Sequence, residues 1–200
     1  MNGATRPQPA LPHRGRETTG LRALPKRRGE LSGLSVVQWS AVTQMELSQV
    51  LMVRSAGELE VVVPAIDDDG WDAKVHLRGE FGSELTVQAK CTGHLLVRES
   101  RAPDLKIHFK LPRRRILNHR RFWFFIAHFD LERMLFSDPV FLVPSATLHE
   151  HARPREDGEK MDFSFVASMS PNSKDKWRPY QVPLAELADR FVHMLRRPCR

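Results

Sequence analysis

Apolar residues recur at helical spacing near the beginning and again at the end of this chain of 200 residues. Between residues 34 and 54 they stand three or four positions apart, which predicts a helix with Ser35 as its N-cap and Gly57 at its end. A second amphipathic pattern, over residues 184–195, predicts another helix. We therefore expect the folded part of the chain to begin and end with a helix.

The residues between these two helices have patterns typical of β-strands. Short apolar or alternating runs predict strands at 59–63, 72–77, 85–91, 105–111, 122–129 and 139–143, and an edge strand at 163–167. An acidic turn over residues 67–70 precedes the second of these strands. The run 122–129 is almost continuously apolar, as expected of a central strand that is buried on both faces. This order of elements predicts an α/β sandwich around one mixed sheet.

Composition divides the chain into two parts. Residues 1–33 are rich in Pro, Gly, Arg and Thr and lack a hydrophobic period, which predicts a disordered basic tail before a folded domain at 34–200. The net charge of +7 favours a polyanionic partner such as nucleic acid. The alternative is that the excess arginine only solvates the surface.

Cysteine content and hydropathy argue against a secreted or membrane protein. Cys91 and Cys199 are too few for a zinc site and imply no disulfide framework, which suits a reducing cytoplasm. The most apolar run, at 122–127, is far shorter than the ~20 residues of a membrane-spanning helix. No secretory signal is evident at the start of the chain. We expect a cytoplasmic protein without membrane contact.

The most informative polar residues are Asp72, Gln88 and Lys90, in two successive predicted strands. Side chains alternate between the faces of a strand, so Gln88 and Lys90 share one face while Ala89 points into the core. If the two strands pair as a hairpin, Asp72 can share a face with both. Metal-assisted phosphodiester hydrolysis needs oxygen ligands beside a fixed cation. Asp72, Gln88 and the carbonyl of Ala89 are the candidate metal ligands, and Lys90 would orient the water; the alternative is that they are ordinary strand residues.

Two short segments carry a family resemblance. They are Asp68-Asp69-Gly70-Trp71-Asp72 and Val87-Gln88-Ala89-Lys90-Cys91, which follow a helix with a glutamate and a strand. This arrangement resembles the PD-(D/E)XK nuclease superfamily and is similar, within it, to the Mrr-type restriction endonucleases and a bacterial branch close to them. The resemblance implies a restriction-endonuclease-like α/β sandwich, with a central mixed sheet flanked by helices.

The resemblance also implies roles for individual residues. Asp72 and Gln88 would be metal ligands and Lys90 a catalytic residue, with Glu46 as the best match to a glutamate that often joins the site from the first helix. Glutamine often occupies the second acidic position in the Mrr-type family, as Gln88 does here. It nevertheless departs from the acidic consensus of the superfamily, which puts the metal affinity and the turnover in question.

The resemblance implies a magnesium-dependent endonuclease, with manganese as a substitute, and we expect such an enzyme to cleave DNA in restriction or phage defence. Two alternatives stay open. One is a nuclease-fold module that binds nucleic acid but hydrolyses it poorly. The neutral Gln88, at a position that is acidic in the consensus, favours this alternative. The other is a subunit of a larger defence complex with an ATPase or sensor partner. A homodimer is also open.

The densest basic stretch precedes the predicted central strand. Arginine clusters with aromatic neighbours suit contacts to the nucleic-acid backbone. The candidates for such contacts are Arg113, Arg114, Arg115, Arg120 and Arg121. The alternative is a solvent-exposed connection between strands. His149 and His151, two residues apart in a predicted polar loop, lack a third ligand nearby and do not predict a metal site.

Overall fold

Residues 33–64, 70–80, 82–98, 101–115, 118–152 and 154–197 are described by a computed structural model of the protein, apart from the side chains of Arg98 and Arg115. The predicted basic tail, up to residue 32, lies outside the described residues, as do residues 67–69 of the acidic turn. In the described part of the chain, no helix is long and apolar enough to cross a membrane.

The described residues form three helices and eleven strands. The helices are α1 (Val36–Arg54), α2 (Ser145–His151) and α3 (Leu187–Arg196). The strands are β1 (Leu59–Val62), β2 (Ala73–Leu77), β3 (Glu84–Thr92), β4 (Leu95–Arg98), β5 (Arg101–Pro112), β6 (Phe122–Asp130), β7 (Leu135–Phe136), β8 (Val140–Pro144), β9 (Arg155–Asp157), β10 (Lys160–Ser168) and β11 (Gln181–Val182). Short 3-10 turns cover Arg113–Arg115, Arg178–Tyr180 and Leu184–Glu186.

Helix α1 begins and ends where the sequence predicts. The Ser35 hydroxyl accepts a hydrogen bond from the Gln38 backbone N–H (3.2 Å), and the Gln38 side chain accepts one from the Ser35 N–H (2.9 Å). This reciprocal cap satisfies two amide groups that a helix start otherwise leaves unpaired. Beyond the other end, Gly57 has φ +80°, a left-handed conformation that glycine adopts without strain.

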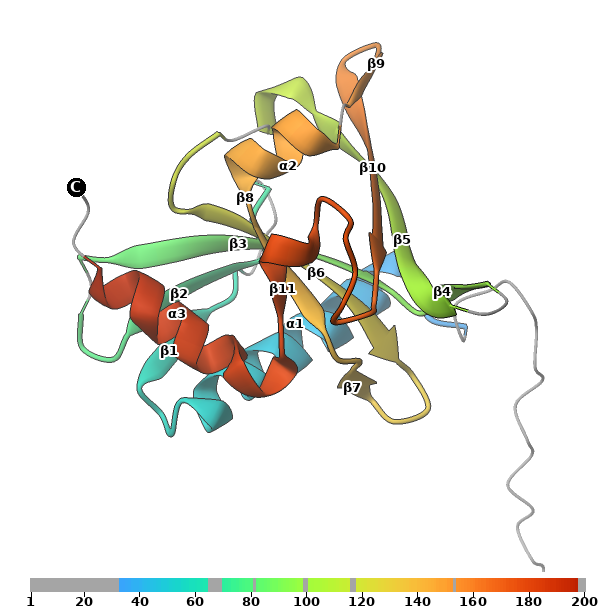
Figure 1. Cartoon of the computed structure of the whole chain (residues 1–200). Helices are drawn as coiled ribbons and strands as arrows, with labels where there is room; N and C mark the ends of the chain where they lie inside the picture. The colour runs from blue at the N-terminus through green and yellow to red at the C-terminus, as the bar shows by residue number, and fades with distance from the viewer. Residues whose placement is uncertain are drawn as a thin grey trace, which may run out of the picture. The chain divides into compact units, whose positions relative to one another are not determined.

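A mixed sheet forms the centre of the fold. In the described part of the chain it has seven strands, in the order β1-β2-β3-β6-β8-β11 with β7 paired to β6 (Figure 1). Strands β3 and β6 run parallel, whereas the other neighbours are antiparallel. Strand β6 is buried on both faces, as its apolar run predicts. The structure confirms the predicted α/β architecture, with a central mixed sheet flanked by helices.

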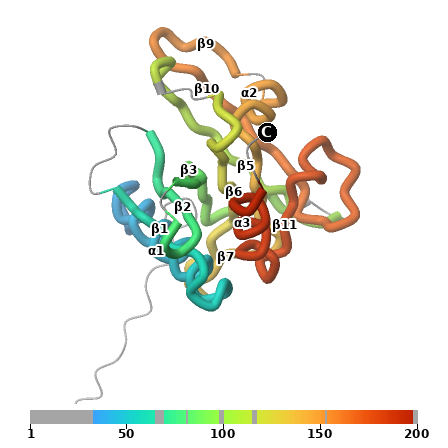
Figure 2. Tube along the Cα trace, turned by 90° about the vertical axis from the view of Figure 1, so that its left-hand side faces the viewer, coloured from blue at the N-terminus to red at the C-terminus, as the bar shows by residue number. Residues whose placement is uncertain are grey.

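The prediction of one sheet is wrong, because a second sheet lies against the first. Within the described residues it has four antiparallel strands in the order β4-β5-β10-β9 (Figures 1 and 2). Strand β10, predicted as an edge strand, is therefore an interior strand of the second sheet. Its alternating Phe163, Phe165 and Ala167 are buried, and Phe165 contacts Phe141 of the first sheet with ring centroids 5.3 Å apart. Periodicity identifies such a strand but not the sheet to which it belongs.

Two hydrophobic cores lie on the two faces of the first sheet. The first core joins the sheet to α1 and α3, and contains Phe125 and Ala127 of β6. The second core joins the sheet to α2 and the second sheet, and contains Phe124 and Ile126 of the same strand. Figure 1 shows α1 and α3 on one side of the sheet and α2 with β10 on the other. Alternate residues of one strand thus face two different environments.

The segment with His149 and His151 is helical, not the predicted loop, because it forms α2. His149 packs in the second core, with its ring 6.0 Å from that of Phe124 and 5.5 Å from that of Phe163. Its Nε2 atom is buried and has no hydrogen-bond partner in the part of the chain that the structure describes. Burial lowers the pKa of this imidazole below its ordinary value of 6.5.

We expect His149→Phe to stabilise the protein by about 1 kcal/mol at neutral pH, because it removes a buried nitrogen without a partner. The gain should grow below pH 6.5, where the unfolded chain binds a proton that the folded His149 resists. Urea unfolding at pH 5.5 and pH 8 measures both effects, with the exposed His108→Phe as the control. A stability gain that does not increase towards acid pH would contradict the assignment.

Candidate active site

Asp72 stands immediately before β2 and is buried, with 8% of its surface exposed. Its backbone N–H donates to the carbonyl of Val87 (2.8 Å), and its Oδ2 accepts a hydrogen bond from the backbone N–H of Ala89 (2.7 Å). The regular pairing of β2 with β3 ends at Ala73 and Val87. Beyond this last pair, the Asp72 carboxylate accepts the hydrogen bond of the Ala89 N–H, which a backbone carbonyl of β2 would accept in a regular antiparallel pair. Gly70, with φ +74°, allows the turn that leads into this position.

A second donor, from helix α1, fixes the other oxygen of this carboxylate. The side-chain amide of Gln44 donates to Oδ1 of Asp72 (2.9 Å) and also lies 3.3 Å from the hydroxyl of Ser40 on the preceding helical turn. Sequence reasoning missed Gln44. The one signal available was a polar residue beside the buried stripe of the helix, and that signal is weak.

Gln88 is buried, with 4% of its surface exposed, and its Oε1 atom has no hydrogen-bond partner among the described residues. A buried acceptor without a partner is rare in folded proteins and invites a ligand, an ion or a water molecule. Gln88 pairs in register with Phe124 of β6, whose side chain lies in the second core. Its side chain therefore leaves the face of the sheet that is turned towards α2 and the second sheet.

Lys90 leaves the same face two residues later. Its Nζ atom lies 5.5 Å from the ring centroid of Phe109 on β5, a cation–π arrangement. Ala89 and Cys91, the alternate residues, pack against the first core. The prediction that Gln88 and Lys90 share a face while Ala89 points into the core is confirmed. Burial raises the pKa of the Cys91 thiol to about 12, so this thiol stays protonated at neutral pH.

The carbonyl of Ala89 faces the same edge as Asp72. In an antiparallel pair, the N–H and C=O groups of one residue point to the same neighbouring strand. Since the N–H of Ala89 bonds to Asp72, its C=O also points towards β2, beyond the last pair of the ladder. The Asp72 carboxylate and the Ala89 carbonyl thus lie at the same end of the β2–β3 ladder. The predicted sharing of a face by Asp72, Gln88 and Lys90 is not seen, because Asp72 is bonded from α1 on one side of the sheet and the side chain of Gln88 leaves the other side.

These donors fit a hard divalent cation. Mg²⁺ prefers oxygen ligands and usually keeps several waters, so it needs few ligands from the protein. No cluster of three or more His, Cys, Asp or Glu side chains with metal-binding geometry occurs among the described residues. A cation bound beside Asp72 would therefore depend on the neutral oxygens of Gln88 and Ala89.

Helix α1 presents Gln44, not Glu46, to Asp72. Gln44 and Glu46 are two positions apart in sequence, which places their side chains about 200° apart around an α-helix. Glu46 therefore projects from the opposite edge of the buried face of α1. Burial raises the pKa of the Glu46 carboxyl, and the charge of Arg54 partly offsets this. The structure therefore does not bring Glu46 together with Asp72, and its predicted catalytic role has no geometric support.

The predicted arginines have different surroundings. Arg113 forms an exposed ion pair with Glu156 (2.8 Å). Arg121 is half-buried, and its guanidinium donates to the hydroxyl of Ser83 (2.9 Å) and the carbonyl of Glu84 (3.1 Å), so it holds the start of β3. Arg114 and Arg120 are exposed, and the side chain of Arg115 lies outside the described residues. Arg121 thus has a structural role at the start of β3.

No protein-family model matches this chain, and no curated protein matches it. Among solved structures, the chain is similar to a bacterial homing endonuclease, I-Ssp6803I, with a TM-score of 0.45 and 13% sequence identity. The match covers 74% of this chain and 89% of that chain.

Proposed function

We propose that this protein is a metal-dependent nuclease that hydrolyses phosphodiester bonds, in DNA, at the site formed by Asp72, Gln88 and Lys90. Two observations carry the proposal: the buried carboxylate of Asp72, bonded to the N–H of Ala89 at 2.7 Å, and the buried Oε1 of the preceding residue, Gln88, which has no hydrogen-bond partner among the described residues. Buried oxygens of this kind, beside a lysine, suit a bound divalent cation and an anionic substrate.

Each residue has a separate part in the proposed reaction. Asp72, the carbonyl of Ala89 and Gln88 would hold Mg²⁺, or Mn²⁺ in its place, which polarises a phosphoryl oxygen when bound. Gln44 keeps the Asp72 carboxylate in one orientation through its 2.9 Å hydrogen bond. The ammonium group of Lys90 would orient the attacking water and stabilise the negative charge that develops on the phosphate in an in-line displacement.

Charge and resemblance support the substrate class. The net charge of +7 and the exposed Arg113, Arg114 and Arg120 suit a polyanion, bound through its backbone without reading of the bases. The similarity of residues 68–72 and 87–91 to Mrr-type restriction endonucleases supports membership of the PD-(D/E)XK superfamily and a role in restriction or phage defence.

The metal site can be tested without an activity assay, through Gln88. We expect Gln88→Glu to bind Mg²⁺ about 10-fold more tightly than the wild type, because a charged ligand replaces a neutral one. Without metal, the same variant should be less stable by about 1–3 kcal/mol, since a second carboxylate is buried near Asp72. Calorimetric titration, and thermal unfolding in MgCl₂ and in EDTA, measure the two effects. Gln88→Leu is the control and should lose the stabilisation by metal; an unchanged metal response in both variants would exclude Gln88 as a ligand.

The proposed function is tested by incubating plasmid and oligonucleotide substrates with the full chain in Mg²⁺, in Mn²⁺ and in EDTA. Cleavage that requires either metal supports the nuclease. Salt-sensitive binding without cleavage, in folded protein with both metals, would favour a nucleic-acid-binding module. Intact substrate together with copurification of an ATPase or sensor protein would favour a subunit of a larger complex.

A further inference from the structure

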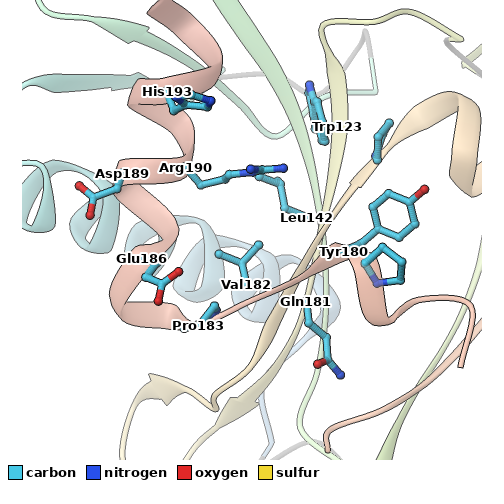
Figure 3. A pocket seen from close by; sticks show the side chains of 12 residues that line it. Trp123, Leu142, Tyr180, Gln181, Val182, Pro183, Glu186, Asp189, Arg190 and His193 are labelled. Atoms are coloured by element: carbon cyan, nitrogen blue, oxygen red, sulfur yellow. The ribbon is translucent and has the colours of Figure 1, made fainter. Parts of the chain in front are cut away.

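A groove of about 680 Å³ lies between helix α3 and the β8–β11 side of the first sheet. Trp123, Leu142 and Tyr180 line the side formed by the sheet and the turn before β11, and Arg190 and His193 line the helix side (Figure 3). The volume is in the range of small-molecule sites, which are about 300–1,000 Å³. The groove is therefore large enough for a ligand.

The Trp123 wall of this groove faces away from the side chains of Gln88 and Lys90. Trp123 packs against the first core, whereas the next residue, Phe124, lies in the second core and pairs in register with Gln88. Neighbouring residues of a strand point to opposite faces. Trp123 and the side chains of Gln88 and Lys90 consequently lie on opposite faces of the first sheet.

The helix wall carries two basic side chains, Arg190 and His193, and two acidic ones, Glu186 and Asp189. In Figure 3 the carboxylate of Asp189 points away from Arg190. Arg190 and His193 are three residues apart, a spacing that places them on the same side of α3. Arg190 is exposed, extends towards Leu142 in Figure 3, and has no hydrogen bond or ion pair within the described part of the chain. Glu186 lies four residues before Arg190, a spacing that favours an ion pair on a helix, but the two side chains form no ion pair among the described residues. A guanidinium without an internal partner suits an anion.

The opposite wall consists mostly of apolar and aromatic side chains, and hydrogen bonds hold the turn before β11 in place. The backbone N–H of Tyr180 donates to the carbonyl of Trp177 (2.9 Å), and the two rings lie 6.4 Å apart. The neighbouring Gln181 side chain donates to the carbonyls of Ser168 (2.7 Å) and Ser170 (3.1 Å). Aromatic rings held in this way form a surface against which a planar base can pack.

We propose that this groove binds a nucleotide, with its phosphate on Arg190 and His193 and its base against the wall of Trp123 and Tyr180. A guanidinium beside an aromatic wall fits a nucleotide better than it fits an inorganic anion, because an inorganic anion has no planar group to pack against the rings. The nucleotide can be free or can be the terminal residue of a nucleic-acid strand, because both present the same phosphate and base. The proposal does not require that the chain cleave nucleic acid.

Calorimetric titration of the full chain in EDTA, where metal-dependent cleavage is suppressed, tests the proposal. The probes are deoxyadenosine 5′-monophosphate, inorganic phosphate, and a single-stranded oligonucleotide with either a 5′-phosphate or a 5′-hydroxyl end. We expect Arg190→Ala to weaken binding of the nucleotide or the phosphorylated oligonucleotide by about 10-fold or more, because a charge-assisted hydrogen bond is lost. His193→Gln should also weaken it. Arg133→Ala, which removes an exposed arginine from the turn after β6, is the matched control and should have no effect.

The probes also distinguish the two sources of the nucleotide. Tighter binding of the phosphorylated oligonucleotide than of its hydroxyl form and of the mononucleotide assigns the groove to a strand end, whereas tight binding of the mononucleotide alone assigns it to free nucleotide. Lack of binding by all probes, equal effects of Arg190→Ala and Arg133→Ala, or equal affinity for inorganic phosphate and the nucleotide would overturn the proposal. Since no cleavage is measured, these outcomes are independent of the proposed nuclease activity.

Discussion

Replacing Asp72 with asparagine is expected to lower the rate of metal-dependent DNA cleavage by about 10³-fold or more. The substitution keeps the size of the side chain but removes the one anionic oxygen ligand of the proposed set, which leaves only the neutral Gln88 and Ala89 oxygens for the cation. It also turns an amide NH₂ group towards one of the two donors that now bond to the carboxylate, the N–H of Ala89 or the side chain of Gln44. The variant should therefore be less stable by about 1–3 kcal/mol as well.

Two measurements separate the loss of activity from the loss of stability. Single-turnover cleavage over a range of Mg²⁺ concentrations gives the rate, and thermal unfolding with and without Mg²⁺ shows whether the folded variant still binds metal. The matched control is Asp157→Asn, which removes only an exposed carboxylate paired with Lys110 on the second sheet. Cleavage by Asp72→Asn at the wild-type rate would remove Asp72 from the proposed mechanism.

The local elements of the fold could be predicted because their signals are local. The capping residues Ser35 and Gln38 and the left-handed Gly57 lie next to the helix that they delimit. The apolar run of β6 needs no knowledge of its neighbours to be interpreted as a strand buried on both faces. In contrast, β10 is paired with β5, some fifty residues earlier, and the pattern of a strand does not specify so distant a partner.

The candidate site divides in the same way. Gln88 and Lys90 lie on one strand, so strand alternation alone predicts that their side chains share a face. Asp72 lies just before β2, and alternation did not predict that its carboxylate is bonded from helix α1. Gln44 reaches Asp72 from a helix 28 residues earlier, a contact that only the packing of α1 on the sheet creates. A search by chemical type selects the acidic Glu46, whereas the rotation of the helix selects Gln44. The sequence shows the type of each residue of α1, but not how the helix is rotated on the sheet, and this rotation decides which side chain reaches Asp72.

Lys90→Met is expected to lower the cleavage rate by about 10²–10³-fold while leaving Mg²⁺ binding intact. Methionine keeps an unbranched stem against Phe109, the ring that now lies 5.5 Å from Nζ, but it cannot stabilise charge on the phosphate. Removing a cation near the metal should, if anything, favour metal binding slightly, the opposite of the effect expected for Asp72→Asn. The control is Lys74→Met on the neighbouring strand, which also loses a lysine over an aromatic ring, that of Trp71 at 5.1 Å. Equal losses of activity in the two lysine variants would mean that Lys90 acts through general charge rather than at the reacting phosphate.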